Sequence, residues 1–567
     1  MKKTLALVLA LLMALSLFAA CGKKETAESA KDSKPQTAAA FTNNTAALEA
    51  SSVEDTILGT QQEAVDTSKV HPSDDATLKV AWNFEPGGLT QPGHAFSSNM
   101  NPSYIFGQCL LKWDGAANDV APQIATSWEW IDDLTLRLHL RDDVTSIAGD
   151  PFTAKDVIFT WNWCNDTPSL ASYYGIFDYE KTKAIDDYTV DIALLEPYPF
   201  LTIDLAHTAY IVACEESAKR IGLDKTDRDP SAQTGPYKLV KWDEGQCVYC
   251  ERRDDYWDPL PYYKYVELWT VSDTNTRCMG VEAGDYDIAM NPSTTATLAA
   301  ETSTKATGWF VAGAGAIANF VFNSDLEPLN IKEARQAVAL AINYEAQLQI
   351  ALSGKGILTS NALCSPYNTY YTEPSDPEKN FMRYDPELAK QKLVEAGYPN
   401  GFTINCKYRT AEAMTVASAE MLVNQLGEVG ITLQLVPQES AAWYADMRAG
   451  DWNTHLSVGG NPNPKRNITT IDGTRIDHNA ATGSAGKNWA PEGTVELIDR
   501  CLQTVDDEKR MEAFRELNDV CCEYVPMVIL YCPWKTALTS SEIVGFNVTS
   551  MGAVDVCSVY PQEYIAE

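Results

Sequence analysis

The segment ASAEMLVNQLGEVGITLQL, residues 417–435, decides the fold class. Its first part, up to Val429, reads as a helix, and Gly430 supplies the stop signal for that helix. Ile431, Leu433 and Leu435 then alternate with polar residues, as expected of a half-buried strand. A helix that runs directly into a strand favours α/β layers over a β-sandwich or a helical bundle.

Other parts of the chain carry the same mixture of signals. Residues 134–140 alternate leucine with polar residues, which predicts another half-buried strand. Thr153-Ala-Lys-Asp156 is a capping-box pattern and predicts a helix start, because its hydroxyl and carboxylate can satisfy free helix amides. Asp385 precedes Pro386 in N-cap and first-turn order, and Gly397 marks the end of the helix that follows. Strands and helices are therefore predicted to intermix from about residue 77 onwards.

The N-terminus combines Lys2 and Lys3 with an apolar run that leads to Ala19-Ala20-Cys21. The run is shorter than the roughly 20 residues that a membrane-spanning helix needs, so a cleavable export signal is expected. The arrangement resembles a bacterial lipoprotein signal, which implies a signal peptide at residues 1–20 and a lipid anchor on Cys21. The alternative is an ordinary secretion signal with a chance cysteine. Residues 21–76 are predicted to form a flexible tether, because they are polar, nearly free of aromatics and without periodicity.

Composition narrows the partners and the chemistry. The formal net charge of −33 argues against nucleic acid and anionic lipid surfaces as partners. One of the 14 cysteines is Cys21, and the other thirteen lie mostly singly in hydrophobic segments. That placement favours buried, reduced thiols, although disulfides stay open. The sequence has one C-x-x-C, Cys247-Val-Tyr-Cys250, but no second one and no H-E-x-x-H. We therefore expect no zinc site, and we expect no other cofactor.

Eight short motifs follow one another between about residues 125 and 431. They are Ala125-Thr-Ser-Trp128-Glu, Leu136-Arg-Leu-His-Leu-Arg141, Phe152-Thr-Ala-Lys-Asp156, Thr234-Gly-Pro-Tyr237 with Tyr256-Trp257, Glu282-Ala-Gly284-Asp-Tyr-Asp287, Ala334-Arg335-Gln336-Ala337, Tyr384-Asp-Pro386 with Ala396-Gly397-Tyr398, and Leu426 with Gly430-Ile431. Together they resemble the extracytoplasmic solute-binding proteins of ABC importers, in the oligopeptide-, dipeptide- and nickel-binding family (family 5 type). One motif alone would be weak evidence, but the shared order is specific.

The resemblance implies an α/β, two-lobed fold of the type II periplasmic-binding-protein kind, with mixed sheets, a hinge and a small inserted domain. Lobe I is expected at residues 77–112, 225–312 and 526–567, the inserted α/β domain at 113–224, and lobe II at 313–525. The implied function is capture of a solute, foremost a peptide, in the cleft between the lobes and delivery to an ABC permease. The protein is then expected to be a monomeric, non-enzymatic receptor, extracytoplasmic and lipid-anchored to the cell membrane of a bacterium.

Candidate solute-binding residues come from a late segment in which peptide-binding relatives carry an aspartate for the peptide amino terminus. Here glycine or asparagine stands in its place, around Gly459, Asn461, Asn463 and Arg466. A charged amine would lose a strong, charge-assisted bond there, so amidated, cyclic or sugar-like solutes stay open. The other reading of this segment is a Pro/Asn turn that only shapes a loop.

Aromatic residues are the remaining candidates: Trp443 and Trp489, which have polar neighbours, and Tyr531, which lies near the last strand. Trp443, Trp489 and Tyr531 could stack on sugar rings or line side-chain pockets, although such residues also pack locally. A surface-anchored hydrolase is the rival of a different class, yet no carboxylate pair stands out and a G-x-S-x-G elbow is missing. We therefore assign no catalytic and no metal-binding residues. A sensory receptor with the same cleft, which binds solute without delivering it, also remains open.

Overall fold

The computed structural model describes residues 65–83, 85–90, 100–114, 119–167, 171–311, 315–410, 412–460, 463–471, 485–486, 489–546 and 555–565. Cys21 and the predicted signal peptide lie outside these residues, as does Asn461. In the part of the chain that is described, no helix has the length and apolar character needed to cross a membrane.

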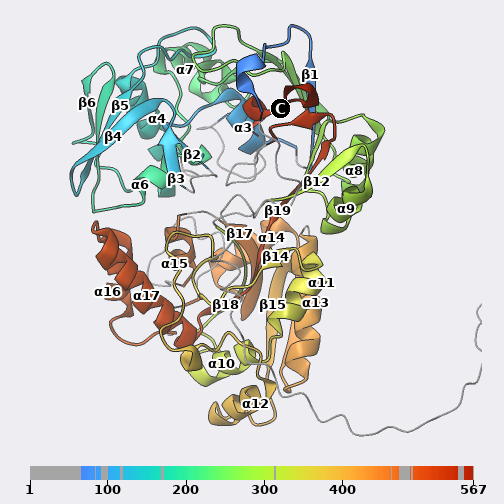
Figure 1. The fold of residues 1–567 in the computed structure, drawn as a ribbon. Coiled ribbons are helices and arrows are strands. Elements are labelled where there is room, and N and C mark those ends of the chain that lie inside the picture. The colour runs from blue at the N-terminus through green and yellow to red at the C-terminus, as the bar shows by residue number, and fades with distance from the viewer. Residues whose placement is uncertain are drawn as a thin grey trace, which may run out of the picture. The chain divides into compact units, whose positions relative to one another are not determined.

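The first lobe is built on a seven-stranded mixed sheet with the strand order β12-β19-β11-β1-β10-β9-β8 (Figure 1). Its strands are β1 (Thr77–Trp82), β8 (Tyr237–Asp243), β9 (Cys247–Arg252), β10 (Tyr265–Thr270), β11 (Ile288–Met290), β12 (Ala306–Val311) and β19 (Lys535–Ser540). β1 runs parallel to β10 and β11, whereas β8, β9, β12 and β19 pair antiparallel. Helix α8 (Thr274–Ala283) packs against β11 and β19 of this sheet, and helix α9 (Thr294–Ala299) packs against β12 and β19. Short elements α3 (Met100–Phe106), β20 (Ile543–Val544) and β21 (Tyr560–Pro561) complete this lobe.

The second lobe is built on a six-stranded sheet with the order β14-β18-β13-β17-β15-β16. Its strands are β13 (Ala316–Phe322), β14 (Gly356–Ile357), β15 (Thr403–Arg409), β16 (Thr432–Gln438), β17 (Thr454–Gly460) and β18 (Met527–Pro533). Its helices are α10 (Lys332–Leu340), α11 (Tyr344–Leu352), α12 (Pro386–Glu395), α13 (Ala413–Gly427), α14 (Ser440–Ala449), α15 (Lys465–Ile471), α16 (Thr494–Gln503) and α17 (Asp507–Tyr524). β13 and β18 are buried along their whole lengths and are apolar except for Asn319 of β13, as expected of central strands with both faces covered.

A four-stranded antiparallel sheet, in the order β4-β5-β7-β6, forms the inserted domain. Its strands are β4 (Ala125–Asp132), β5 (Thr135–Leu140), β6 (Lys183–Asp186) and β7 (Thr189–Ala193), next to the ribbon of β2 (Leu111–Asp114) and β3 (Asp119–Pro122). Helices α4 (Ala154–Asn165), α5 (Ala171–Tyr174), α6 (Leu201–Asp204) and α7 (Glu215–Ile221) accompany the sheet. The leucine alternation of β5 buries Leu136, Leu138 and Leu140, as predicted.

The chain passes between the two large sheets twice. The first crossing lies between Val311 at the end of β12 and Ala316 at the start of β13. The second crossing is Trp534 alone, because β18 ends at Pro533 in one sheet and β19 begins at Lys535 in the other. Sheet pairing therefore keeps residues 527–533 in the second lobe, so the return to lobe I comes later than the expected boundary at 525/526. The sequence could not show this, since β18 and β19 follow each other directly with Trp534 alone between them.

The end of the predicted tether is part of the folded unit. Val65 forms an antiparallel bridge with Ile565, and the amide of Asp66 donates to the carbonyl of Tyr564 at 3.1 Å. The amide of Ser73 donates to the carbonyl of Tyr262 at 2.9 Å. These backbone partners lie far away in the sequence, so the local composition of residues 65–76 gave no sign of them.

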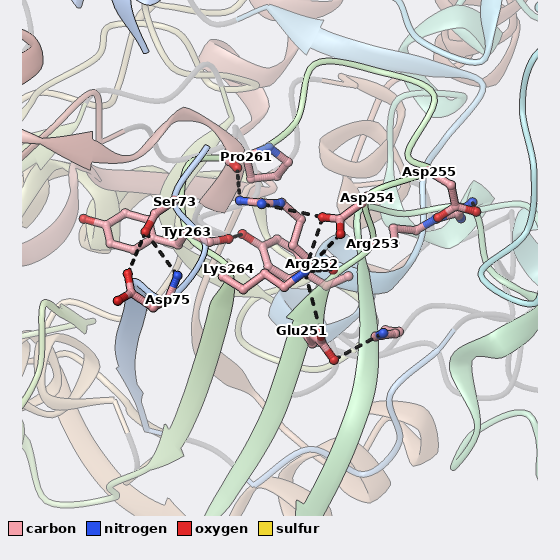
Figure 2. Close-up of polar contacts among 12 residues, drawn as sticks. Ser73, Asp75, Glu251, Arg252, Arg253, Asp254, Asp255, Pro261, Tyr263 and Lys264 are labelled. Atoms are coloured by element: carbon pink, nitrogen blue, oxygen red, sulfur yellow. Dashed lines mark hydrogen bonds and ion pairs between the residues drawn. The ribbon is translucent and has the colours of Figure 1, made fainter. Parts of the chain in front are cut away.

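A cluster of charged side chains lies between the end of β9 and the start of β10 (Figure 2). Arg252 is buried and donates to the carbonyls of Pro261 and Tyr262 at 3.0 and 2.9 Å. Asp254 pairs with Arg252 at 3.6 Å and with Lys264 at 3.3 Å. Figure 2 shows these side chains gathered where β9 ends and the chain turns back towards β10. These contacts hold the loop between β9 and β10 in place, so the cluster has a structural role in the first lobe.

All thirteen cysteines in the described part are free thiols, and all except Cys557 are buried. Burial raises the pKa of these thiols; it raises that of Cys406, for example, to about 12. Such thiols stay protonated and unreactive near neutral pH.

Candidate functional site

One loop of the inserted domain reaches the second lobe. Phe200 is fully buried, with its ring centroid 5.3 Å from that of Tyr370 and 6.3 Å from that of Phe514. Four residues earlier, Glu196 accepts a hydrogen bond of 2.9 Å from the side-chain amide of Gln503. The loop thus places an aromatic side chain against the second lobe, in an arrangement that an opening of the lobes would disrupt.

Asn463, one of the predicted solute-binding residues, takes part in the same interface. Its side-chain nitrogen donates to the hydroxyl of Tyr198 at 2.8 Å and to a carboxylate oxygen of Asp204 at 2.6 Å. The Tyr198 hydroxyl in turn donates to the other oxygen of Asp204 at 2.8 Å. In this conformation the Asn463 amide therefore connects the second lobe to the inserted domain. A pocket of about 210 Å³ lies beside these contacts, lined among others by Trp130, Tyr198, Val505 and Arg510.

The other predicted residues of the late segment lie close to Asn463 in the chain. Gly459 is an exposed residue of β17, opposite Ile317 of β13. A Cβ atom added at Gly459 would meet no atom within 4 Å, so the described residues leave open space above this end of the strand. Arg466 belongs to α15, but its side chain is outside the described part, like Asn461. The contacts of the described residues therefore do not test whether this segment binds the solute, and that role stays a prediction.

The three predicted aromatic residues are buried in this conformation. Trp443 donates from its indole nitrogen to the Lys407 carbonyl at 3.4 Å, and Trp489 donates to the Ile471 carbonyl at 2.6 Å. The Tyr531 hydroxyl lies 2.8 Å from that of Ser418 on α13. All three rings belong to the main hydrophobic core, where they stabilise the second lobe. Their role as solute contacts stays a prediction.

A charged pair that the sequence analysis did not single out lies between β15 and α13. Arg409 ends β15, Glu412 precedes α13, and the two side chains form an ion pair. Arg409 also donates to the Tyr444 hydroxyl at 3.0 Å and lies 5.2 Å from the centre of the Trp443 ring. Burial raises the pKa of Glu412, while the charges of Arg409 and Lys535 oppose that rise. The available signal was an arginine at a strand end with a carboxylate three residues later, ahead of a helix.

Among the described residues, no group of three or more His, Cys, Asp and Glu side chains could hold a metal ion. His455 is fully buried, with its ring 5.4 Å from that of Trp443 and 4.6 Å from that of Trp452. We therefore treat His455 as a core residue.

Two large sheets joined by short connections, with an inserted domain that contacts the second lobe, make up the two-lobed architecture of this chain. Residues 119–475 match the family model for bacterial extracellular solute-binding proteins, family 5 middle region. The match covers more than half of the sequence. The chain belongs to family 5 of the bacterial extracellular solute-binding proteins.

Individual relatives agree with this assignment. The chain is 23% identical over 483 residues to the probable ABC transporter periplasmic-binding protein SapA of Escherichia coli (strain K12), covering 80% of this chain and 86% of that protein. The dipeptide-binding protein of Pseudoalteromonas sp. SM9913, solved with Met-Leu, superposes with a TM-score of 0.73 at 19% identity, over 86% of this chain and all of that one (100%). NikA of Brucella suis, solved with Fe(III)-EDTA, superposes with a TM-score of 0.74 at 20% identity, over 86% of this chain and 100% of that one. The two-lobed α/β fold predicted from the motifs is thereby confirmed.

Proposed function

We propose that this chain captures a peptide in the cleft between its lobes and delivers it to an ABC permease, with a lipid on Cys21 keeping it at the membrane. The observation that supports the proposal is that the two large sheets are joined by short connections, one between Val311 of β12 and Ala316 of β13 and one at Trp534 between β18 and β19. Lobes joined in this way can close around a solute, and a solute drives closure by binding the closed form better. The relatives supply the transport role, since they are binding proteins of transporters and not enzymes.

A thermal-shift screen of residues 22–567 against peptides, oligosaccharides and nickel tests the solute class. Binding to the folded state must raise the unfolding temperature by mass action, and we expect peptides to do so. If oligosaccharides alone raise it, the chain is still a receptor but not for peptides. Turnover of any of these compounds by the purified chain would contradict a binding role without catalysis.

The solute-facing segment is proposed to run from the end of β17 through Asn461 to Arg466. Gly459 offers a direct test, because a side chain at this position would extend into the open space above the strand. We expect Gly459→Leu to weaken solute binding by at least about tenfold while the unfolding temperature without solute changes little. Gly427→Leu is the matched control, since a Cβ there also meets no atom within 4 Å but lies at the far end of α13. Equal affinity of the two variants, together with unchanged binding by Asn461→Ala, would remove this segment from the site.

A further inference from the structure

The pocket of about 210 Å³ at the junction of the inserted domain and the second lobe is a candidate for a second binding site. Its walls come from both bodies: Trp130, Asp133 and Tyr198 of the inserted domain, and Val505, Asp507 and Arg510 at or just before the start of α17. Among the described residues that line it, none belongs to the two connections between the large sheets or to the proposed solute segment at 459–466. The pocket is therefore distinct from the proposed solute site.

The arginine in the pocket wall is already occupied by partners of its own. Arg510 is 5% exposed, and its guanidinium donates to the carbonyls of Thr504 and Val505 at 2.7 and 2.9 Å. It also donates to the hydroxyl of Tyr370 at 3.2 Å and forms an ion pair with Asp507. Little of its hydrogen-bonding capacity is left for a guest, so the pocket offers no strong site for an anion.

The pocket has one negative charge without a partner. Asp133 lies exposed in the turn between β4 and β5, and no described residue makes a hydrogen bond or an ion pair with it. Because Asp507 and Arg510 neutralise each other, the carboxylate of Asp133 sets the net charge of the lining at minus one. The net charge of −33 on the whole chain raises the local concentration of cations further.

Aromatic rings supply the other part of the pocket wall. Trp130 is partly buried and Tyr198 is 4% exposed. The ammonium group of Lys465 lies 4.6 Å from the centre of the Tyr198 ring, so this ring already attracts one cation. Aromatic faces beside a carboxylate favour organic cations, with tryptophan the most effective ring. A pocket of this volume suits a small one.

We propose that this pocket binds a small organic cation of the quaternary ammonium or protonated amine class and that the bound cation holds the inserted domain against the second lobe. A guest enclosed by both bodies binds best when they are in contact, so it favours that arrangement. Tyr198 also accepts the hydrogen bond of 2.8 Å from Asn463, which connects the pocket wall to the proposed solute segment. Cation and solute should then each raise the affinity for the other. This coupling rests on the proposed capture function, whereas cation binding itself does not.

The first test uses choline and its uncharged analogue of the same shape, 3,3-dimethylbutan-1-ol, without any solute. Full-length protein in detergent is titrated calorimetrically with each compound. We expect choline to bind and the alcohol to bind at least about tenfold more weakly. Trp130→Ala should weaken choline binding by about tenfold and Asp133→Asn by about three- to fivefold, whereas Trp130→Phe should retain most of it.

Two matched variants control for general effects. Trp128→Ala removes a partly buried tryptophan from the same face of β4, outside the pocket lining. Asp142→Asn removes the same charge from an exposed position of the inserted domain. We expect both to bind choline like the unaltered chain. Equal binding of choline and the alcohol, no binding of choline, or equal losses in the control variants would overturn the cation site.

The coupling to the second lobe has its own test. Phe200→Ala removes a ring that packs on the second lobe but does not line the pocket, so choline binding should fall by at least about tenfold. Unchanged choline binding in this variant would overturn the coupling. Since these titrations contain no solute, a failure of the proposed capture function would leave the choline result in place, and the two failures are distinguishable.

Discussion

Arg335 shows how a single residue of a family motif acts in the fold. It is 1% exposed, and its guanidinium donates to the carbonyls of Leu329, Trp489, Tyr524 and Val525 at 2.8–3.1 Å. Burial lowers its pKa to about 10, so the group is still a cation at neutral pH. The planar fork of arginine suits this set of acceptors from several segments of the second lobe, and lysine cannot reproduce it.

Arg335→Lys should therefore destabilise the protein strongly. Lysine keeps the charge but leaves several buried carbonyls without donors, and we expect a loss of about 2–4 kcal/mol in the free energy of unfolding. Urea denaturation monitored by tryptophan fluorescence measures the change. Arg500→Lys is the control, because Arg500 and Glu516 form an exposed pair, and its effect should be under about 0.5 kcal/mol. Similar losses for both variants would refute the structural role of Arg335.

The carboxyl group of Asp150 leads to a prediction about the stability of the protein at acidic pH. Hydrogen bonds from Arg220 and from Ser217 hold the pKa of its carboxyl below the ordinary 3.8. A depressed carboxyl pKa adds stability above pH 3.8, and this stability disappears as the pH falls through the lower value of the folded state. Asp150→Asn should therefore unfold at a lower temperature than the unaltered chain at pH 7, and the difference should shrink below pH 3.8. A difference that does not depend on pH would contradict the ionic origin of the effect.

Residue-level prediction from the sequence succeeded where the determinants are local. The capping box forms, with the Thr153 amide donating to Asp156 at 2.6 Å, and Asp385 accepts from the Leu388 amide at 2.9 Å. The Tyr531 hydroxyl finds its partner on Ser418 of α13, which lies 113 residues earlier in the chain, so local sequence could not reveal this contact.

At the scale of elements, the loop that carries Phe200 decides how the inserted domain meets the second lobe. Order and type of the main elements followed from periodicity: the predicted helix before Gly430 is α13 and the strand after it is β16. Which sheet a strand joins did not follow, because pairing of β13 with β17 and β18 is a long-range choice. The closing contact was equally hidden, since Glu196-Pro-Tyr-Pro-Phe200 reads only as a turn.

Phe200→Ala should shift the receptor towards an open form. The ring is buried against Tyr370 and Phe514 of the second lobe, and its loss should remove about 1.5–3 kcal/mol from the closed state. Solute affinity should then fall by about 10- to 100-fold, and small-angle scattering should report a larger radius of gyration with solute at subsaturating concentration.

Phe159→Ala is the control for this prediction, since Phe159 contacts Trp163 and Lys219 within the inserted domain. It should alter stability but leave affinity and radius unchanged. If Phe200→Ala binds solute as tightly as the unaltered chain, the loop is not part of the closing mechanism.

At the scale of the whole molecule, the proposed receptor separates capture from attachment. Capture needs the two lobes and the hinge, whereas attachment needs Cys21, which lies outside the described residues. The resemblance of the N-terminus to a lipoprotein signal and the family assignment support this division.

Cys21→Ser should therefore leave solute affinity unchanged and reduce uptake of labelled peptide by cells. Without a lipid the exported receptor would diffuse away from its permease, so uptake should recover partly when soluble receptor is added in excess. Loss of affinity in the purified variant would contradict the separation. Undiminished uptake would count against the anchor.

The docking of Val65 and Asp66 on Ile565 and Tyr564 has a mechanical consequence. The ring of Tyr564 also meets that of Tyr262 edge to face, with the centroids 5.5 Å apart, so this attachment point belongs to the first lobe, where Figure 1 shows the C-terminal end. Tension along the preceding chain would enter the protein there, and it would reach the second lobe through the connections between the two large sheets and through the contacts of the inserted domain. The second lobe can then move relative to the first without changing the distance between this attachment point and the proposed anchor. Tension in the predicted tether would therefore not oppose closure of the lobes.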